Sequence, residues 1–242
     1  QCLDVAHVTQ LVIEKGMNDQ SKAAVATSDI RRFYDSINLI LVARYLLKHG
    51  CPAGLVRSML LCQLLPELFF NMMSCCIELR PRAIGCMTGT RVAGVIGSVI
   101  VADAFASKHD EIAKLGYKTD RSTIAVGSWV DNLFAWSTSL FKAIRILEIL
   151  DNYFARAWLL RIKDSSRACM VCKGNAELPV NCDRWPIAKT TVVLGHVLQN
   201  DGGIGADWKV TRAKMWGVFR KCVVNKQTTR VQQRDKMRSL QQ

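Results

Sequence analysis

Hydrophobic and polar residues follow two different periods along the chain, which predicts a mixture of helices and strands. Short runs rich in β-branched and aromatic residues predict strands over residues 23–28, 68–79, 160–172 and 190–199. Apolar residues three and four positions apart predict helices over residues 4–15, 37–49, 55–65, 85–114 (after a Gly-rich start), 140–158 and 208–224. This order of elements indicates an α+β fold in which helices pack on one face of an antiparallel sheet.

Residues 123–137 carry the most informative pattern, because two apolar runs there flank an Asp-Asn pair. The pattern predicts a β-hairpin whose turn presents the carboxylate of Asp131. A second carboxylate, Asp29, ends the strand predicted over residues 23–28. If the two strand ends converge, Asp29 and Asp131 are the minimum ligands for a two-metal site of phosphoryl transfer.

The composition narrows the choice of partner. The chain has 242 residues, half of them apolar, with a formal net charge of +13 and a pI near 9.5. Such a surplus favours a polyanion, either nucleic acid or an anionic membrane surface, over a merely basic soluble protein. The apolar runs are too short to span a bilayer, so we expect no membrane insertion. Because the chain begins at Gln1, without Met and without a signal peptide, we expect a fragment of a longer protein.

The ten cysteines follow no disulfide-like spacing, which favours a reducing, intracellular compartment, nuclear or cytoplasmic. Cys169 and Cys172, with Cys182 and His196, leave open a zinc site. The first two lie in a strand-like run, where they are expected to face opposite sides of the sheet. Buried thiols are therefore the favoured interpretation.

Five segments, in order, resemble motifs of reverse transcriptases. The segment from Asp29 to Ser36 is similar to the first palm motif, and residues 87–94 are similar to the template-gripping motif. Trp129-Val130-Asp131-Asn132 resembles the catalytic turn, and residues 161–166 resemble the next palm segment more loosely. Residues 193–202 are similar to the Leu-Gly primer-grip hairpin of non-LTR retrotransposon polymerases. Together the motifs cover residues 4–224.

The resemblance implies an RNA-directed DNA polymerase of a non-LTR retrotransposon. Its palm, with a remnant of the fingers, would occupy residues 1–203, and a basic thumb-like helical segment and tail would occupy residues 204–242. It would add deoxynucleotides to the 3′-hydroxyl of a DNA primer on an RNA template, using two Mg²⁺ or Mn²⁺ ions. No stable protein partner is expected.

The resemblance also implies roles for single residues. The metal ligands would be Asp29, Asp131 and the backbone carbonyl of Ile30, and Asn132 would complete the catalytic turn. Tyr34 would lie under the sugar of the incoming nucleotide; Gly89 and Lys163 would complete its binding site. Nucleic acid would contact the following residues: Thr88, Arg91, Lys209, Arg212, Lys214, Arg220 and Lys221. The aromatic residues among these cations, Trp208, Trp216 and Phe219, are expected to pack on the palm.

Asn132 stands where the family has a second acidic residue, which removes one negative charge from a site for two divalent ions. An alternative hypothesis is therefore a decayed reverse transcriptase-like domain that only binds nucleic acid. A further alternative, an unrelated basic α+β domain, would place Asp29 and Asp131 far apart.

Overall fold

The computed structural model describes residues 2–18, 22–64, 68–72, 75–79, 84–120, 122–172 and 184–219. The helices are α1 (Cys2–Asn18), α2 (Phe33–Ser36), α3 (Leu39–Lys48), α4 (Ala53–Leu64), α5 (Arg91–Ser107), α6 (His109–Ala113), α7 (Leu140–Tyr153) and α8 (Gly205–Phe219). The strands are β1 (Ala24–Asp29), β2 (Leu68–Met72), β3 (Cys75–Leu79), β4 (Tyr117–Lys118), β5 (Thr123–Ile124), β6 (Val126–Trp129), β7 (Asn132–Ser137), β8 (Ala168–Val171), β9 (Thr190–Val193) and β10 (His196–Gln199). The short helix α2 and the strand pair β4–β5 were not predicted.

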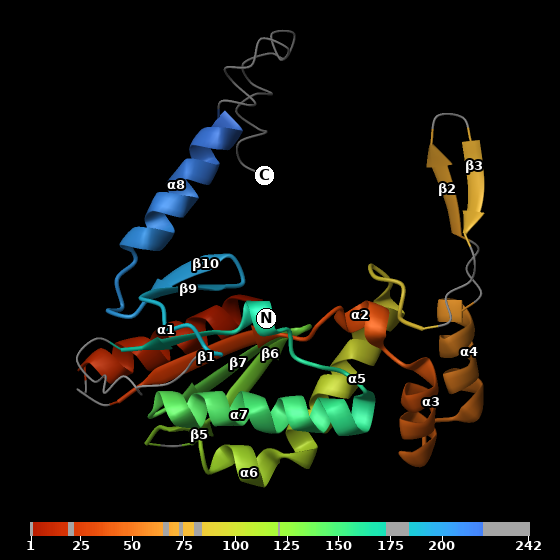
Figure 1. Ribbon diagram of the computed structural model, residues 1–242, viewed down its shortest axis with the longest axis horizontal. Helices are drawn as coiled ribbons and strands as arrows, with labels where there is room; N and C mark the ends of the chain where they lie inside the picture. The colour runs from red at the N-terminus through yellow and green to blue at the C-terminus, as the bar shows by residue number, and fades with distance from the viewer. Residues whose placement is uncertain are drawn as a thin grey trace.

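A four-stranded sheet in the order β6-β7-β1-β8 forms the centre of the molecule. Its neighbouring strands are antiparallel, and β1 pairs with β7 so that Asp29 lies opposite Asn132. Helix α7 lies along one face of this sheet (Figure 1). Ala24 and Ala26 point into the core on that side, whereas Val25, between them, points into a second core on the other face. The predicted α+β class is confirmed.

Helix α1 covers part of the second face, which the sequence pattern did not predict. Its residues Ala6, Val12 and Ile13 are buried in the second core. A buried hydrogen bond fixes it there, because the indole Nε1 of Trp136 donates to Thr9 Oγ1 at 3.0 Å. The prediction of helices on one face is thus incomplete: the sheet lies between α7 and α1.

Helices α5 and α7 are joined through one carboxylate, that of Asp103. Its Oδ2 accepts hydrogen bonds from Tyr153 Oη at 2.7 Å and from Trp158 Nε1 at 2.9 Å. Trp158 lies in a π-helical segment, Phe154–Trp158, that continues α7. The predicted helix over 140–158 is therefore present, but its last turn is wider than an α-helical turn. The ring of Tyr45 in α3 lies 5.3 Å from that of Trp158, so α3 packs against the same group of side chains around Asp103.

Two predicted extended segments have a different form in the structure. Of residues 160–172 only β8 is a strand, because residues 160–163 make a single bridge, between Ile162 and Ile30, before a short 3₁₀ turn. Residues 190–199 form the hairpin β9–β10 around Leu194 and Gly195, whose φ angles of 52° and 89° are those of a tight turn.

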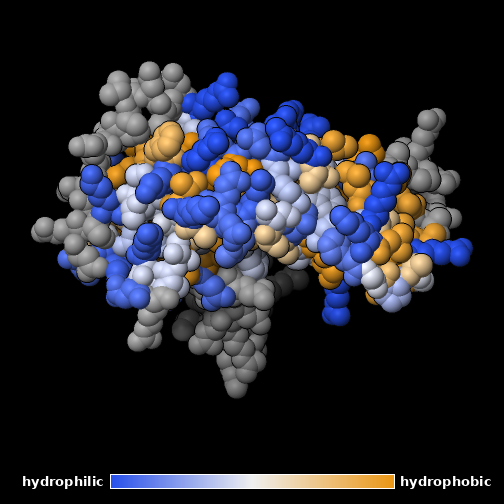
Figure 2. Space-filling model, turned by 90° about the horizontal axis from the view of Figure 1, so that it is seen from below, coloured by the Kyte–Doolittle hydropathy of each residue, from blue (hydrophilic) through white to orange (hydrophobic). Residues whose placement is uncertain are grey.

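The periphery carries elements that project from this body. Helix α8 extends away from the β9–β10 hairpin, and α3, α4 and the β2–β3 pair lie at the opposite end (Figure 1). Apolar side chains gather at the α3–α4 end in the view from below, where most of the surface is hydrophilic (Figure 2). No helix in the described ranges is long and apolar enough to cross a membrane.

The prediction of buried thiols is confirmed for Cys169 and Cys172 but is wrong for Cys62, which is exposed on α4. Cys169 is buried in the core beside α7 and Cys172 in the core beside α1, so the two thiols face opposite sides of the sheet. Burial raises the pKa of the Cys172 thiol to about 11. Cys182 lies outside the described residues. Among the residues that the structure describes, no three His, Cys, Asp or Glu side chains form a metal-binding group.

Candidate active site

The two predicted carboxylates lie at the same end of the sheet. Asp29 is the last residue of β1, and Asp131 lies in the two-residue turn between β6 and β7. The backbone amide of Ile30 donates to the Asp131 carbonyl at 2.9 Å, so the end of β1 is bonded directly to the turn. The register of the strands thus brings together two residues that are far apart in the sequence.

The carboxylate of Asp29 is destabilised by its surroundings. Partial burial raises its pKa, and the nearby charge of Asp131 raises this pKa further, while Lys163 lowers it by a smaller amount. Two anionic side chains that repel each other favour a cation between them. The charge of Asp131 also acts on Tyr34, because burial and this charge both disfavour the phenolate and raise the pKa of the phenol.

The turn that carries Asp131 is strained at the preceding residue. Val130 has a φ of 57° and is 40% exposed. A β-branched residue rarely adopts this left-handed conformation, which costs about 1–2 kcal/mol. Glycine or asparagine would meet the turn geometry without that cost. The pairing of β6 with β7 on both sides of the turn must offset this strain beside the carboxylate.

Asn132 begins β7 and is half-buried beside Asp131. Its side-chain Nδ2 donates to Asp131 Oδ1 over 3.4 Å, near the limit of a hydrogen bond. The amide thus orients a carboxylate oxygen of its neighbour, and its own oxygen brings no negative charge to the site.

Ser166 fixes the backbone of Asp29, a role that the sequence did not reveal. Its Oγ accepts from the Asp29 amide at 2.8 Å and donates to the Lys163 carbonyl at 2.8 Å. The Lys163 amide in turn donates to the Asp29 carbonyl at 2.8 Å, which closes the connection. Ser28 Oγ lies 3.2 Å from the same hydroxyl.

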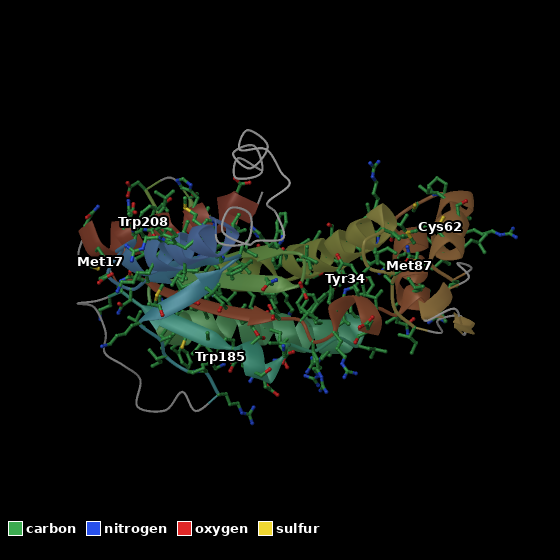
Figure 3. All side chains as sticks on the ribbon, turned by 90° about the horizontal axis from the view of Figure 1, so that it is seen from above. Met17, Tyr34, Cys62, Met87, Trp185 and Trp208 are labelled. Atoms are coloured by element: carbon green, nitrogen blue, oxygen red, sulfur yellow. The ribbon has the colours of Figure 1, made fainter. Side chains whose placement is uncertain are left out.

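Tyr34 lines a cavity of about 960 Å³ beside the turn, together with Trp129, Val130 and the outer face of α5. Figure 3 shows Tyr34 beside α5, in the middle of the molecule. Helix α5 comes close because residue 97 is glycine: a Cβ there would lie 2.9 Å from Cε1 of Phe33, the residue before Tyr34. The cavity therefore lies between α5 and the turn that carries Asp131, although Asp131 itself does not line it.

The loop that precedes α5 carries the predicted nucleic-acid contacts. Thr88, Gly89 and Arg91 are exposed, and Gly89 has a φ of 86° with open space around it. The loop is held from below by Gln63, whose side chain accepts from the Met87 amide at 2.7 Å. Gln63 was missed, although a polar residue in the apolar stripe of α4 is a signal of such a role.

The cations of α8 are exposed, as nucleic-acid contact would require. Lys209, Arg212 and Lys214 lie on this projecting helix, and Arg220 and Lys221 lie outside the described residues. The expected packing of the aromatic residues on the palm is wrong where the structure describes it. Trp208 is 58% and Trp216 is 56% exposed, because α8 leaves the body of the molecule instead of lying along it. The side chain of Phe219 is outside the described part.

Comparison with solved structures shows that the chain shares its fold with part of two telomerases. One match is the apo telomerase of Candida tropicalis truncated from its C-terminal domain, with a TM-score of 0.54, 8% identity and 81% of this chain covered. Another is the telomerase of Candida albicans in complex with the TWJ fragment of telomeric RNA, with a TM-score of 0.50, 11% identity and 91% covered. The chain spans 38% of the length of each. The likeness is one of fold.

No family model matches the chain. No curated protein matches it either.

The donor set at the turn fits a hard divalent cation. Asp29 and Asp131 supply carboxylate oxygens, and no backbone amide in the described part of the chain donates to the Ile30 carbonyl. Hard cations of this kind take oxygen ligands and leave positions for water and phosphate. Two carboxylates are few for two ions, so phosphate oxygens would have to complete the coordination.

Proposed function

We propose that the chain is the palm of an RNA-directed DNA polymerase of a non-LTR retrotransposon type, with a basic thumb-like segment from residue 204. The observation that supports it best is the meeting of Asp29 and Asp131 at one end of an antiparallel sheet, where the charge of Asp131 raises the pKa of Asp29. The polymerase-like fold and the order of the five motifs point the same way.

The proposed reaction joins a deoxynucleotide to a DNA primer on an RNA template. The primer 3′-oxygen forms a bond to the α-phosphorus, the bond from that phosphorus to the bridging oxygen breaks, and diphosphate leaves with both electrons. Two Mg²⁺ or Mn²⁺ ions, held by Asp29, Asp131 and the Ile30 carbonyl, would lower the pKa of the primer hydroxyl and neutralise the leaving charge. The proton of that hydroxyl passes to solvent.

The other residues of the site would position the substrates. Tyr34, on the wall of the cavity, would pack under the sugar, and Gly89 would leave room at the nucleotide. Thr88 and Arg91 would contact the template strand. Lys163 would pair with a phosphate, and the cations of α8 would follow the nucleic-acid backbone. Asn132 would hold the Asp131 carboxylate in place.

Primer extension on an RNA template with Mg²⁺ tests this proposal. Asp131→Ala in the full-length protein should abolish extension, since it removes one of two carboxylates. Asp110→Ala is the matched control, because the Asp110 side chain is 97% exposed on α6 and away from the turn. Undiminished extension by the Asp131 variant would disprove the assignment.

A second candidate function is nucleic-acid binding without chemistry. Asn132 favours it, because the amide brings no charge and takes one oxygen of Asp131 as a hydrogen-bond partner. Titration with Mn²⁺, followed by electron paramagnetic resonance, separates the two. Tighter binding of Mn²⁺ to the wild-type protein than to the Asp131→Ala variant would support the enzyme. Equal binding to both would support a decayed domain that only binds nucleic acid.

A further inference from the structure

The loop that leads into α5 is bonded at its start to the segment that carries Tyr34. We call residues 85–90 the entry loop. The Gly85 amide donates to the Ile37 carbonyl at 2.9 Å, and the Cys86 amide donates to the Tyr34 carbonyl at 2.7 Å. The first half of the entry loop is therefore fixed to the backbone that follows β1.

The second half of the entry loop is bonded to one side chain of α4, that of Gln63. Its Oε1 accepts from the Met87 amide at 2.7 Å, and its Nε2 donates to Thr90 Oγ1 at 3.1 Å. Figure 3 shows Met87 near Cys62, the residue before Gln63. A single side-chain amide thus bridges both ends of the turn 87–90.

The hydroxyl of Thr90 joins this turn to the start of α5. It donates to the Met87 carbonyl at 3.0 Å, and it accepts from the Ala93 amide at 3.2 Å as well as from Gln63. One donor and two acceptors exhaust the capacity of a hydroxyl. The shape of the turn and the position of the first turn of α5 are therefore set together.

Gln63 is a polar residue among apolar ones on the buried side of α4. It is 3% exposed, and its neighbours one turn away or adjacent, Met59, Leu60 and Leu64, pack against the core that contains α7. A buried amide with its partners in place gives little net stability over an apolar side chain of the same shape. Its hydrogen bonds specify a single geometry instead.

The tip of the entry loop is exposed and has wide conformational freedom in its own sequence. Thr88 and Gly89 form the tip, and a Cβ on Gly89, whose φ is 86°, would meet no other atom within 4 Å. A glycine in open space can adopt many backbone conformations. A loop that is ordered before its ligand arrives loses less entropy on binding, so an anchor below the tip raises affinity.

We propose that Gln63 is a positioning residue for the strand contact of the entry loop. Because it is buried, Gln63 itself does not reach a strand; from α4 it orders the loop, so that Thr88, Gly89 and Arg91 meet a nucleic-acid strand in one shape. The identity of that strand, the template, rests on the proposed function. Loss of the two hydrogen bonds of Gln63 should therefore weaken strand binding while the fold persists.

Binding of a fluorescein-labelled RNA strand to the full-length protein, measured by anisotropy without divalent metal, tests this role. Gln63→Met keeps the length of the side chain and removes both hydrogen bonds. It should weaken binding by about tenfold, because the strand must then order the loop. Leu60→Met, on the same side of α4, is the matched control and should bind as the wild type does. Unchanged binding by Gln63→Met, or an equal loss in Leu60→Met, would overturn the proposal.

Hydrogen exchange separates local positioning from a loss of the fold. In Gln63→Met the amides of the entry loop should exchange faster, while those of β1 and α7 keep their wild-type rates. Faster exchange throughout the chain would mean that Gln63 only supports the fold, and would overturn the role. If Gln63→Met does not fold, Gln63→Asn takes its place, since a side chain one methylene shorter cannot span Met87 and Thr90 together.

Primer extension adds a kinetic readout. Gln63→Met should raise KM for the template–primer by about tenfold and leave kcat, and KM for the deoxynucleotide, near the wild-type values. A lower kcat with an unchanged KM for the template–primer would overturn the role. Strand binding needs neither metal nor nucleotide, so the effect of Gln63→Met can also be measured in Asp131→Ala. Weaker strand binding by Gln63→Met, in a protein that never extends a primer, would keep the positioning role and reject the polymerase.

Discussion

Replacement of Ser166 by alanine should destabilise the protein by about 1–3 kcal/mol. The hydroxyl has one proton, which goes to the Lys163 carbonyl at 2.8 Å, so Ser28 donates in the contact at 3.2 Å. Alanine leaves the amide of Asp29 without an acceptor in a partly buried place, and such a group costs about 1–3 kcal/mol. The Lys163 carbonyl still accepts a hydrogen bond from the Ser166 amide at 3.1 Å, so the loss of its bond from the hydroxyl adds little to the loss of stability.

Equilibrium unfolding in urea, followed by circular dichroism, measures this loss. Ser165→Ala is the control, because Ser165 is exposed and adjacent, and its change should stay within about 0.5 kcal/mol. Ser166→Thr keeps the hydroxyl and should recover most of the stability. A Ser166→Ala loss no larger than that of Ser165→Ala would refute the reasoning that this hydroxyl holds Asp29.

Three further predictions use other parts of the site. Val130→Gly should stabilise the protein by up to about 1 kcal/mol in the same urea assay, because the strain energy relieved at the positive φ is larger than the entropic cost of a glycine. Val192→Gly is the control: it lies at an exposed position of β9 with ordinary strand backbone, and it should destabilise the protein. The pKa of Asp29 is raised, so the folded state binds the proton of this carboxyl more tightly than the unfolded state does. The free energy of unfolding of the wild type, relative to that of Asp29→Asn, should therefore rise as the pH falls from 7 toward 3.8, the ordinary pKa of an aspartate. A difference that does not change with pH would contradict this. Gly97→Ala should be less stable than Gly94→Ala by about 1–3 kcal/mol in thermal unfolding, since only residue 97 of the two has no room for a Cβ.

Local periodicity predicted the elements that carry their own signal. The stripe of α1 follows from the helical period, the strand ending at Asp29 from a short run of apolar residues, and the hairpin at Asp131 from two apolar runs around a polar turn; the structure contains all three. The placement of Cys169 and Cys172 on opposite faces follows from the same period of two. The meeting of Asp29 with Asp131 needed the motif order as well, because register between distant strands has no local signature.

The features that the sequence did not reveal depend on contacts between distant segments. Ser166 serves Asp29 only because residues 161–166 lie against the end of β1, and Gln63 serves Met87 only because α4 packs under the loop. The exposure of Trp208 differs from the expectation because an aromatic residue between cations suits either a core or a projecting helix. The sequence pattern of α1 likewise does not say which face of the sheet this helix covers, so the packing of helices on both faces could not be predicted.

The single carboxylate of Asp103 has a consequence for how the molecule opens. It binds donors from the end of α7 while it belongs to α5, the helix that forms the wall of the cavity. The two helices cannot separate without breaking the hydrogen bonds of Tyr153 and Trp158 to Asp103, so we expect them to open as one cooperative unit in hydrogen exchange. Any shift of the cavity wall on loading would therefore be transmitted to the end of α7, through a side chain that does not line the cavity.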